Sequence, residues 1–149
     1  MWRILGKVAH LWPNKFYKLI SKIHSKLIKF NHTKAGEIII GDHILLLETV
    51  GNKSKKIRKT PLTYAKHEDS YIVAASFSGN DNTPNWYFNL FTSPPYITVD
   101  NCRFKVFVEE IKKDKKEFYW ALLDQVYPTF KTYRERTGRD IPLVKFIKA

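Results

Sequence analysis

Short apolar segments separated by turn residues run through most of this chain, and they limit it to few folds. In the clearest segment, residues 102–111, Cys102, Phe104, Val106 and Val108 alternate with side chains that are mostly charged. This period of two is typical of a half-buried strand and predicts that Cys102 lies in the core. About six antiparallel strands with few helices indicate a barrel or a sandwich. We expect strands at residues 37–40, 43–50, 57–66, 71–76, 96–99, 102–111 and 141–147.

The helical signals are fewer, and the strongest lies near the start of the chain. Residues 14–30 carry apolar side chains every three or four positions, with a row of lysines beside them, which predicts an amphipathic helix. Such a helix packs on its own barrel or lies on a membrane surface, and the pattern leaves both open. Further helices are expected at residues 84–91 and 114–126, with a short one ending at Gly138. No linker divides the 149 residues, so we expect one domain: a basic helix within 1–34 and a barrel over 37–147.

Positive charge is concentrated in the first part of the chain. The net charge is +12, and residues 1–66 hold 14 Lys and Arg against 3 acidic residues. Residues 1–34 contain eight of these basic side chains and no acid. An excess of this kind attracts phosphate, polycarboxylates, nucleic acid or an anionic membrane. The alternative is a basic surface that serves only solubility.

Several classes of chemistry have no support in the sequence. Cys102 is the only cysteine, which excludes a disulfide framework and indicates a reducing compartment. The five histidines lack metal-ligand spacing, so no metal site is expected. No P-loop, nucleophile elbow or dinucleotide-binding glycine motif is present. No apolar run reaches the roughly 20 residues that a membrane span needs, and the start is too charged for a secretion signal. If the chain is an enzyme, an organic cofactor carries the chemistry.

The basic stretch at residues 49–62 is the best place for such a cofactor. A predicted strand ends at Gly51, a turn carries Ser54 and several lysines, and the next strand begins near Arg58. Backbone N–H groups, a hydroxyl and a guanidinium together suit a phosphate group. Basic hairpins are also common as plain solvated turns.

The same stretch resembles a motif of the deazaflavin-dependent nitroreductases, which belong to the split-barrel flavin and deazaflavin oxidoreductases. Gly51-Asn-Lys-Ser-Lys-Lys-Ile-Arg-Lys-Thr-Pro-Leu62 is similar to that family's Gly-x-Lys-(Ser/Thr)-Gly-x-x-Arg-x-x-Pro-Leu. Further pieces follow in the family's order over residues 16–147: Val73-Ala-Ala-Ser76 with Gly79, Pro84-Asn-Trp-Tyr-Phe-Asn-Leu90, Tyr127-Pro128, and Thr137-Gly-Arg-Asp-Ile-Pro142. The resemblance implies a split β-barrel that binds reduced coenzyme F-420, an 8-hydroxy-5-deazaflavin with a polyglutamate tail. It also implies hydride transfer to a quinone, a nitro compound or another activated acceptor.

Roles of individual residues follow from the resemblance alone. It implies that Lys53, Ser54 and Arg58 hold the coenzyme phosphate and the start of its tail, with Lys55 adding charge. The residues implied along or near the deazaflavin are Pro61, Thr63, Ala75, Ser76, Trp86 and Asn89. Ser76, Tyr127 and Tyr133 are the implied catalytic residues: Ser76 hydrogen-bonds the acceptor, and the segment of Tyr127, Phe130 and Tyr133 closes over it. The chain departs from the family at Lys55 in place of glycine, Phe77 in place of a basic residue and Phe130 in place of tyrosine. Lys55 would then strain a turn of positive φ.

Other functions remain open at this point. The same barrel could use FMN, because the phosphate contacts would be shared. Alternatively, the chain could be a basic module for membrane or nucleic acid, although no nucleic-acid-binding signature is present and no nucleic-acid partner is expected. We expect a cytoplasmic protein whose residues 1–34 contact the inner face of the membrane. The acceptor and the oligomeric state are not fixed by the sequence.

Overall fold

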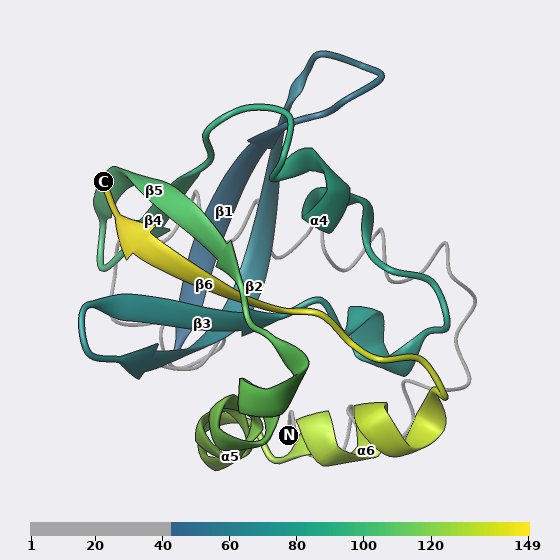
Figure 1. Ribbon diagram of the computed structural model, residues 1–149. Helices are drawn as coiled ribbons and strands as arrows, with labels where there is room; N and C mark the ends of the chain where they lie inside the picture. The colour runs from purple at the N-terminus through teal and green to yellow at the C-terminus, as the bar shows by residue number, and fades with distance from the viewer. Residues whose placement is uncertain (1–42) are drawn as a thin grey trace, which may run out of the picture. The chain divides into compact units, whose positions relative to one another are not determined.

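The computed structural model describes residues 43–149, which belong to one compact unit, Asp42–Ala149. In this part of the chain six antiparallel strands form a closed barrel in the order β1-β2-β3-β6-β5-β4 (Figure 1). The strands are β1 Ile44–Val50, β2 Ile57–His67, β3 Ser70–Ala74, β4 Tyr96–Val99, β5 Cys102–Glu110 and β6 Leu143–Lys148. This confirms the predicted barrel fold, and the strand limits differ from those expected by few residues. The predicted helix at 14–30 and strand at 37–40 lie outside the described residues.

Strand β2 is split between two neighbours, and this positions the candidate site. Its first half pairs with β1, from Val50↔Ile57 to Ile44↔Thr63, whereas only Tyr64–His67 pair with β3. Pro61 therefore lies opposite Leu46 of β1. The other edge of β2 is not paired with β3 at this residue. A proline has no N–H to donate to a neighbouring strand. The pairing of β2 with β3 therefore stops before Pro61.

The alternation in β5 appears in the structure with one exception. Val106 is buried, Phe104 and Val108 are partly buried, and the intervening side chains are exposed. Cys102, however, is exposed, so its predicted core position is wrong. Cys102 directly follows the turn at Asp100–Asn101, whose φ values are 47° and 64°, and it pairs with Val99 at the last step of the β4–β5 ladder. At the rim of a barrel, a side chain that points inward is no longer covered by the packed core.

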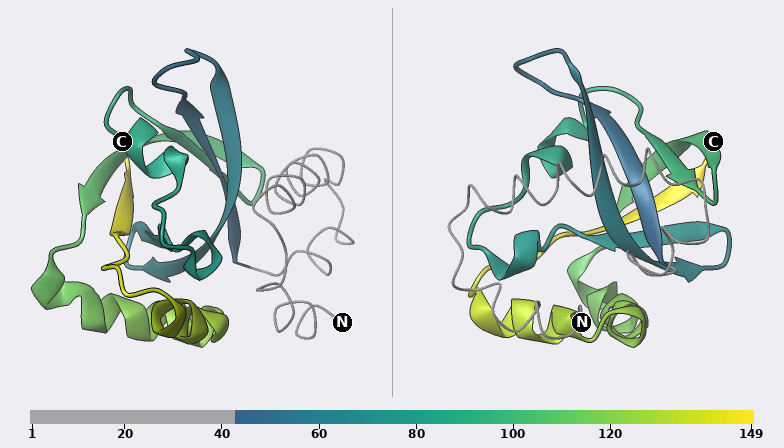
Figure 2. Two further views of the ribbon diagram at one scale, coloured as in Figure 1. Left: turned by 90° about the vertical axis from the view of Figure 1, so that its right-hand side faces the viewer. Right: turned by 180° about the vertical axis from the view of Figure 1, so that it is seen from behind.

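Two cores hold the described residues together. The barrel interior contains Leu45, Leu47, Ile97 and Phe146, each 0% exposed. A second core packs α5 (Lys116–Val126) and α6 (Thr129–Arg136) on the outer face of the barrel, with Leu123 and Phe130 of the two helices among its buried residues. Figures 1 and 2 show both helices along the same side of the barrel. Strands β2, β3 and β6 bury side chains on both faces. Their sequences therefore do not alternate strictly between apolar and polar residues.

The remaining helical elements are short. The aromatic segment forms α4 (Asn85–Asn89), which lies beneath the β1–β2 hairpin in Figure 1. A turn of 3-10 type, η2 (Phe77–Gly79), follows β3, and η3 (Lys113–Lys115) precedes α5. The predicted helices within 84–91, within 114–126 and before Gly138 are confirmed. Among the described residues no helix combines the length and apolarity needed to cross a bilayer.

Candidate functional site

The β1–β2 hairpin is closed by its own backbone and by Ser54. The Gly51 N–H donates to the Lys56 carbonyl at 2.9 Å, and the Lys55 N–H donates to the Gly51 carbonyl at 2.8 Å. The Ser54 Oγ accepts bonds from the Lys56 N–H at 3.4 Å and from Arg58 Nη2 at 3.2 Å. A Cβ at Gly51 would lie 2.5 Å from Ser54 Oγ, so a larger residue there would displace the Ser54 hydroxyl. Ser54 and Arg58, four residues apart in sequence, are thus brought together by the turn.

The hairpin presents cations that have no carboxylate partner within residues 43–149. Glu48, which is 7% exposed, pairs with Lys59 at 3.3 Å and Arg103 at 2.9 Å, and these bonds lower the pKa of its carboxyl although burial alone would raise it. None of the other hairpin cations forms an ion pair with a described residue, and all of them are exposed: Lys53, Lys55, Lys56 and Arg58. A hydroxyl, a guanidinium and flexible ammonium groups on one turn fit a phosphate followed by carboxylates.

Helix α4 is fixed to the base of this hairpin. The Asn52 N–H donates to Asn89 Oδ1 at 3.1 Å, and the Thr92 hydroxyl, which donates to the Asn89 carbonyl at 2.9 Å, lies 3.5 Å from the Val50 carbonyl. Asn89 and Trp86 are each 8% exposed, and Trp86 is part of the barrel core. The structure therefore places two predicted cofactor residues beside the hairpin. The amide oxygen of Asn89 is hydrogen-bonded to the hairpin backbone.

Ala75 and Ser76 lie where β3 has left β2, on the opposite side of the split from Pro61 and Thr63. The Ala75 N–H donates to the Pro142 carbonyl at 2.9 Å, and Ser76 is 7% exposed. Ser76 is followed by three residues in the left-handed region: Phe77, Ser78 and Gly79 have φ values of 47°, 56° and 74°. For the two residues with side chains this conformation costs on the order of 1–3 kcal/mol each.

The two predicted catalytic tyrosines contact each other and this turn. Their hydroxyl oxygens are 3.4 Å apart. A Cβ at Gly79 would lie 3.0 Å from both Cα and the carbonyl oxygen of Tyr133, so the turn and α6 approach as closely as a glycine permits. Burial, and then the neighbouring Tyr127, raise the pKa of Tyr133 well above its usual range. Its phenol therefore keeps its proton throughout the physiological range.

Arg139 is a residue of this region to which the sequence assigned no role. Its side chain donates to the carbonyls of Ala75, Ser76 and Asn80, around the turn that carries Ser76. The available signal was its place in the Thr137-Gly-Arg-Asp-Ile-Pro142 segment, just before the last strand. Every residue has a backbone carbonyl, so a sequence does not show which carbonyls share a donor; the structure does.

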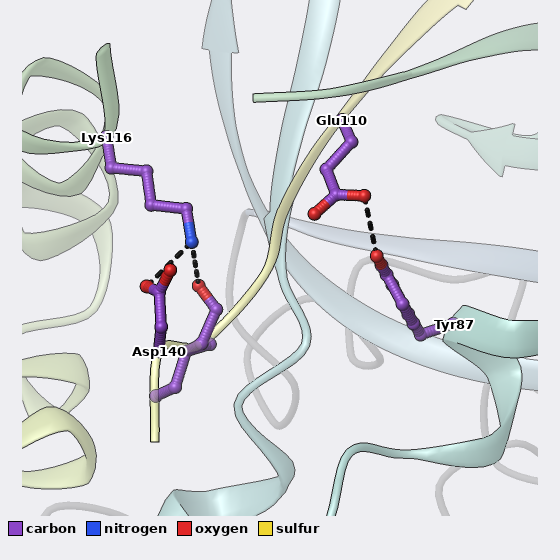
Figure 3. Close-up of polar contacts among 5 residues, drawn as sticks. Tyr87, Glu110, Lys116 and Asp140 are labelled. Atoms are coloured by element: carbon purple, nitrogen blue, oxygen red, sulfur yellow. Dashed lines mark hydrogen bonds and ion pairs between the residues drawn. The ribbon is translucent and has the colours of Figure 1, made fainter. Parts of the chain in front are cut away.

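Two surface hollows lie away from the predicted residues. Their volumes are about 470 and 320 Å³, and both are lined by Lys113, Lys116 and Asp140. Lys116 Nζ donates to Asp140 Oδ1 at 2.7 Å and to the Ile141 carbonyl at 3.0 Å, as Figure 3 shows. None of the predicted cofactor or catalytic residues lines either hollow. The candidate site is thus the edge formed by the hairpin, the split of β2 and the Ser76 turn.

Comparison with known proteins identifies the family. The sequence model of the F420H2-dependent quinone reductases matches residues 20–147. An F420H2-dependent quinone reductase of Mycobacterium tuberculosis is 31% identical over 128 residues, covering 83% of this chain and 86% of that protein. A solved F420-H2 dependent reductase shares 30% identity at a TM-score of 0.62, over 69% of this chain and 92% of its own. A further structure, described as a domain-swapped dimer, shares 25% identity at a TM-score of 0.65, over 87% of this chain and 98% of its own.

These findings agree with the resemblance seen in the sequence motifs and with the split barrel. The match spans the hairpin, α4, the Ser76 turn and both tyrosines. The chain belongs to the F420H2-dependent quinone reductase family and is an oxidoreductase whose cofactor is coenzyme F-420.

Proposed function

We propose that this chain reduces a quinone-type acceptor with reduced coenzyme F-420, and that the β1–β2 hairpin holds the anionic end of the cofactor. The observation that carries the assignment of the hairpin is its set of exposed cations around the Ser54 hydroxyl, none of them paired with a described carboxylate. Arg58 and Ser54 bind the phosphate, while Lys53 and Lys55 lie along the glutamate tail. Such exposed contacts are screened over about 8 Å at physiological ionic strength, so tail binding weakens with salt.

The flat ring system lies along the split of β2. Pro61 and Thr63 come from the part of β2 that β3 does not cover, Ala75 from the departing chain, and Trp86 and Asn89 from α4. These positions border one edge because Asn89 bonds to the hairpin backbone and because β3 leaves β2 at Tyr64. When bound, the reduced deazaflavin supplies the hydride.

The acceptor lies between Ser76 and the two tyrosines. The Ser76 hydroxyl hydrogen-bonds the acceptor, and Tyr127 and Tyr133 cover it with aromatic surface. The Tyr133 phenol is protonated at neutral pH, so its hydroxyl is a hydrogen-bond donor near the acceptor. The protein's main task is to hold donor and acceptor within about 3–3.5 Å and to exclude water. A nitro compound has the same requirement for a flat, hydrogen-bonded site and is an alternative acceptor.

Residues 1–34 bring the enzyme to its acceptor at the inner face of the membrane. Their eight basic side chains without an acid, together with the apolar row at 14–30, suit an anionic lipid surface in which a hydrophobic quinone dissolves. Deleting residues 1–13 and neutralising Lys15, Lys18 and Lys22 should reduce binding to anionic vesicles. Binding equal to that of the parent chain would contradict this part of the proposal.

One titration tests the whole assignment. Reduced F-420 is added to the purified full chain while its absorbance and fluorescence are followed, and FMN is titrated in parallel as the alternative tricyclic cofactor. We expect saturable binding of F-420, its oxidation when a quinone is added, and weaker binding of FMN. Tight binding of FMN with no response to F-420 would reject the proposal, as would binding of F-420 with no oxidation by any quinone or nitro compound.

A further inference from the structure

The turn after Ser76 is held in an unfavourable conformation. Phe77 and Ser78 both have positive φ, at 47° and 56°. Residues with a Cβ rarely adopt this backbone conformation. Only Gly79, at 74°, takes this conformation at no steric cost. Two strained residues in succession persist only where the surrounding structure fixes them. The contacts that fix the turn are therefore part of what positions Ser76.

Arg136 Nη1 donates to the Ser78 carbonyl within the turn at 3.0 Å, and Arg139 supplies the contacts on both sides of the turn. Its Nη2 donates to the carbonyls of Ala75 and Ser76 at 2.8 and 3.0 Å, and its Nε donates to the Asn80 carbonyl at 2.9 Å. One rigid guanidinium thus joins the chain immediately before the left-handed residues to the chain immediately after them. A lysine ammonium is a single point and does not reproduce this fork.

The position of Arg139 is itself fixed. The Arg139 N–H donates to the Thr137 hydroxyl at 3.4 Å, and that hydroxyl donates to Asp81 Oδ1 at 2.8 Å. Arg139 Nη1 is buried without a hydrogen-bond partner among the described residues. Burial also lowers the pKa of the guanidinium, against the influence of Asp81. Burying the charged guanidinium is unfavourable by itself. The hydrogen bonds to the three carbonyls offset this cost.

We infer that Arg139 is a positioning residue that holds the Ser76 hydroxyl in place for the acceptor by clamping the left-handed turn at Phe77–Gly79. It acts through Ser76 and does not contact the acceptor. This inference rests on the proposed function for the role of Ser76, although the clamp itself can be tested without the cofactor.

The first experiment compares arginine substitutions at two places. Arg139→Met removes all three bonds, and Arg139→Lys keeps the charge and is the milder change if the methionine variant folds poorly. Arg134→Met is the matched control, because Arg134 forms a two-bond ion pair with Asp124, at 3.0 and 2.6 Å, and is not bonded to the turn. We expect both Arg139 variants to lower kcat for the acceptor about tenfold or more while the Kd for F-420 stays within about twofold. The control should lower thermal stability and leave kcat unchanged.

A second experiment asks whether the loss arises from the turn. In the Arg139→Lys background, Phe77→Gly removes the Cβ that makes positive φ costly, whereas Phe77→Ala removes the ring and keeps the Cβ. We expect the glycine to recover several-fold of the lost kcat and the alanine to recover none. Backbone amides of residues 77–80 should exchange with deuterium faster in the Arg139 variants than in the parent chain or the Arg134 control, with no cofactor present.

The results separate this inference from the proposed function. Wild-type kcat in both Arg139 variants, equal losses of kcat and F-420 affinity, or equal effects of glycine and alanine at Phe77 would overturn the positioning role. If the parent chain does not oxidise reduced F-420 at all, the proposed function fails. Amide exchange then still decides whether Arg139 clamps the turn, and unchanged exchange overturns the clamp.

Discussion

The hydroxyl of Tyr87 donates a 2.7 Å hydrogen bond to Glu110 Oε2 and so joins α4 to the last residue of β5 (Figure 3). Burial of the ring, together with this bond to a carboxylate, raises the pKa of Tyr87 to about 12. The two residues are 23 positions apart in sequence, and the bond connects the barrel to the helix that carries Trp86 and Asn89.

The shift at Tyr87 predicts how this contact responds to alkaline pH. The folded pKa lies above the value of about 10 expected in the unfolded chain, so the folded state favours the protonated phenol. The stabilisation is fully present below pH 10 and is lost as the pH rises towards 12. Tyr87→Phe should cost about 0.5–1.5 kcal/mol in free energy of unfolding at pH 8, measured by urea denaturation, and less as the pH rises through this window. A cost independent of pH would show that the phenol proton is not involved.

Arg58→Ala should weaken F-420 binding by about one to three kcal/mol, the range for a lost charge-assisted hydrogen bond. The loss should shrink at high salt, because Arg58 is exposed and its attraction to the tail is screened. Lys105→Ala is the matched control, since Lys105 is also exposed, on β5, and lies outside the hairpin. Fluorescence titrations at low and high ionic strength provide the measurement. Equal losses for both variants would mean that only net charge matters, not the place of Arg58 in the turn.

Much of this fold follows from the sequence because period-two patterns and turn residues are local. They identified the barrel strands, and Pro61 within the strand expected at 57–66 was compatible with an edge, a bulge or a missing ladder bond; the structure shows that β3 does not pair with β2 there. The pattern does not say where a barrel ends, and for this reason Cys102 was assigned to the core although it lies at the rim. Nor does the pattern reveal contacts between distant elements. The bond of Asn89 to Asn52 and the three carbonyls bound by Arg139 depend on how the folded chain brings distant segments together. The roles of the site residues remain predictions.

Lys55 has φ 53°, which agrees with the expectation that a lysine in place of the family's glycine strains the turn. Lys55→Gly should therefore be more stable than Lys55→Ala by about 1 kcal/mol, because only glycine relieves the left-handed conformation. Both variants lose the same charge, so both should lose the same factor in F-420 affinity. Urea denaturation and titration of the two variants side by side separate strain from charge. Equal stability would mean that this turn carries no strain at Lys55.

The buried end of α5 offers a test of ion-pair energetics away from the candidate site. The Lys116 side chain is 11% exposed and its ammonium pairs with Asp140, which is 61% exposed. Asp140→Ala should destabilise the fold by about 1–3 kcal/mol, since among the described residues it leaves the buried ammonium with only the Ile141 carbonyl. Lys116→Met removes the charge itself and should cost less. A larger cost for Lys116→Met would show that the pair contributes attraction beyond its desolvation.

Ser76→Ala separates acceptor chemistry from cofactor binding. The Ser76 side chain is buried beside the Arg139 clamp, while the hairpin cations that we propose to hold the anionic cofactor are on another element. We therefore expect kcat for a quinone to fall about tenfold or more and the Kd for F-420 to stay within about twofold, because the lost hydrogen bond is made to the acceptor. Ser93→Ala is the matched control, since its hydroxyl is also buried and has no hydrogen-bond partner among the described residues. Steady-state kinetics and a cofactor titration of both variants are sufficient. A fall in F-420 affinity equal to the fall in kcat would place Ser76 against the cofactor and not the acceptor.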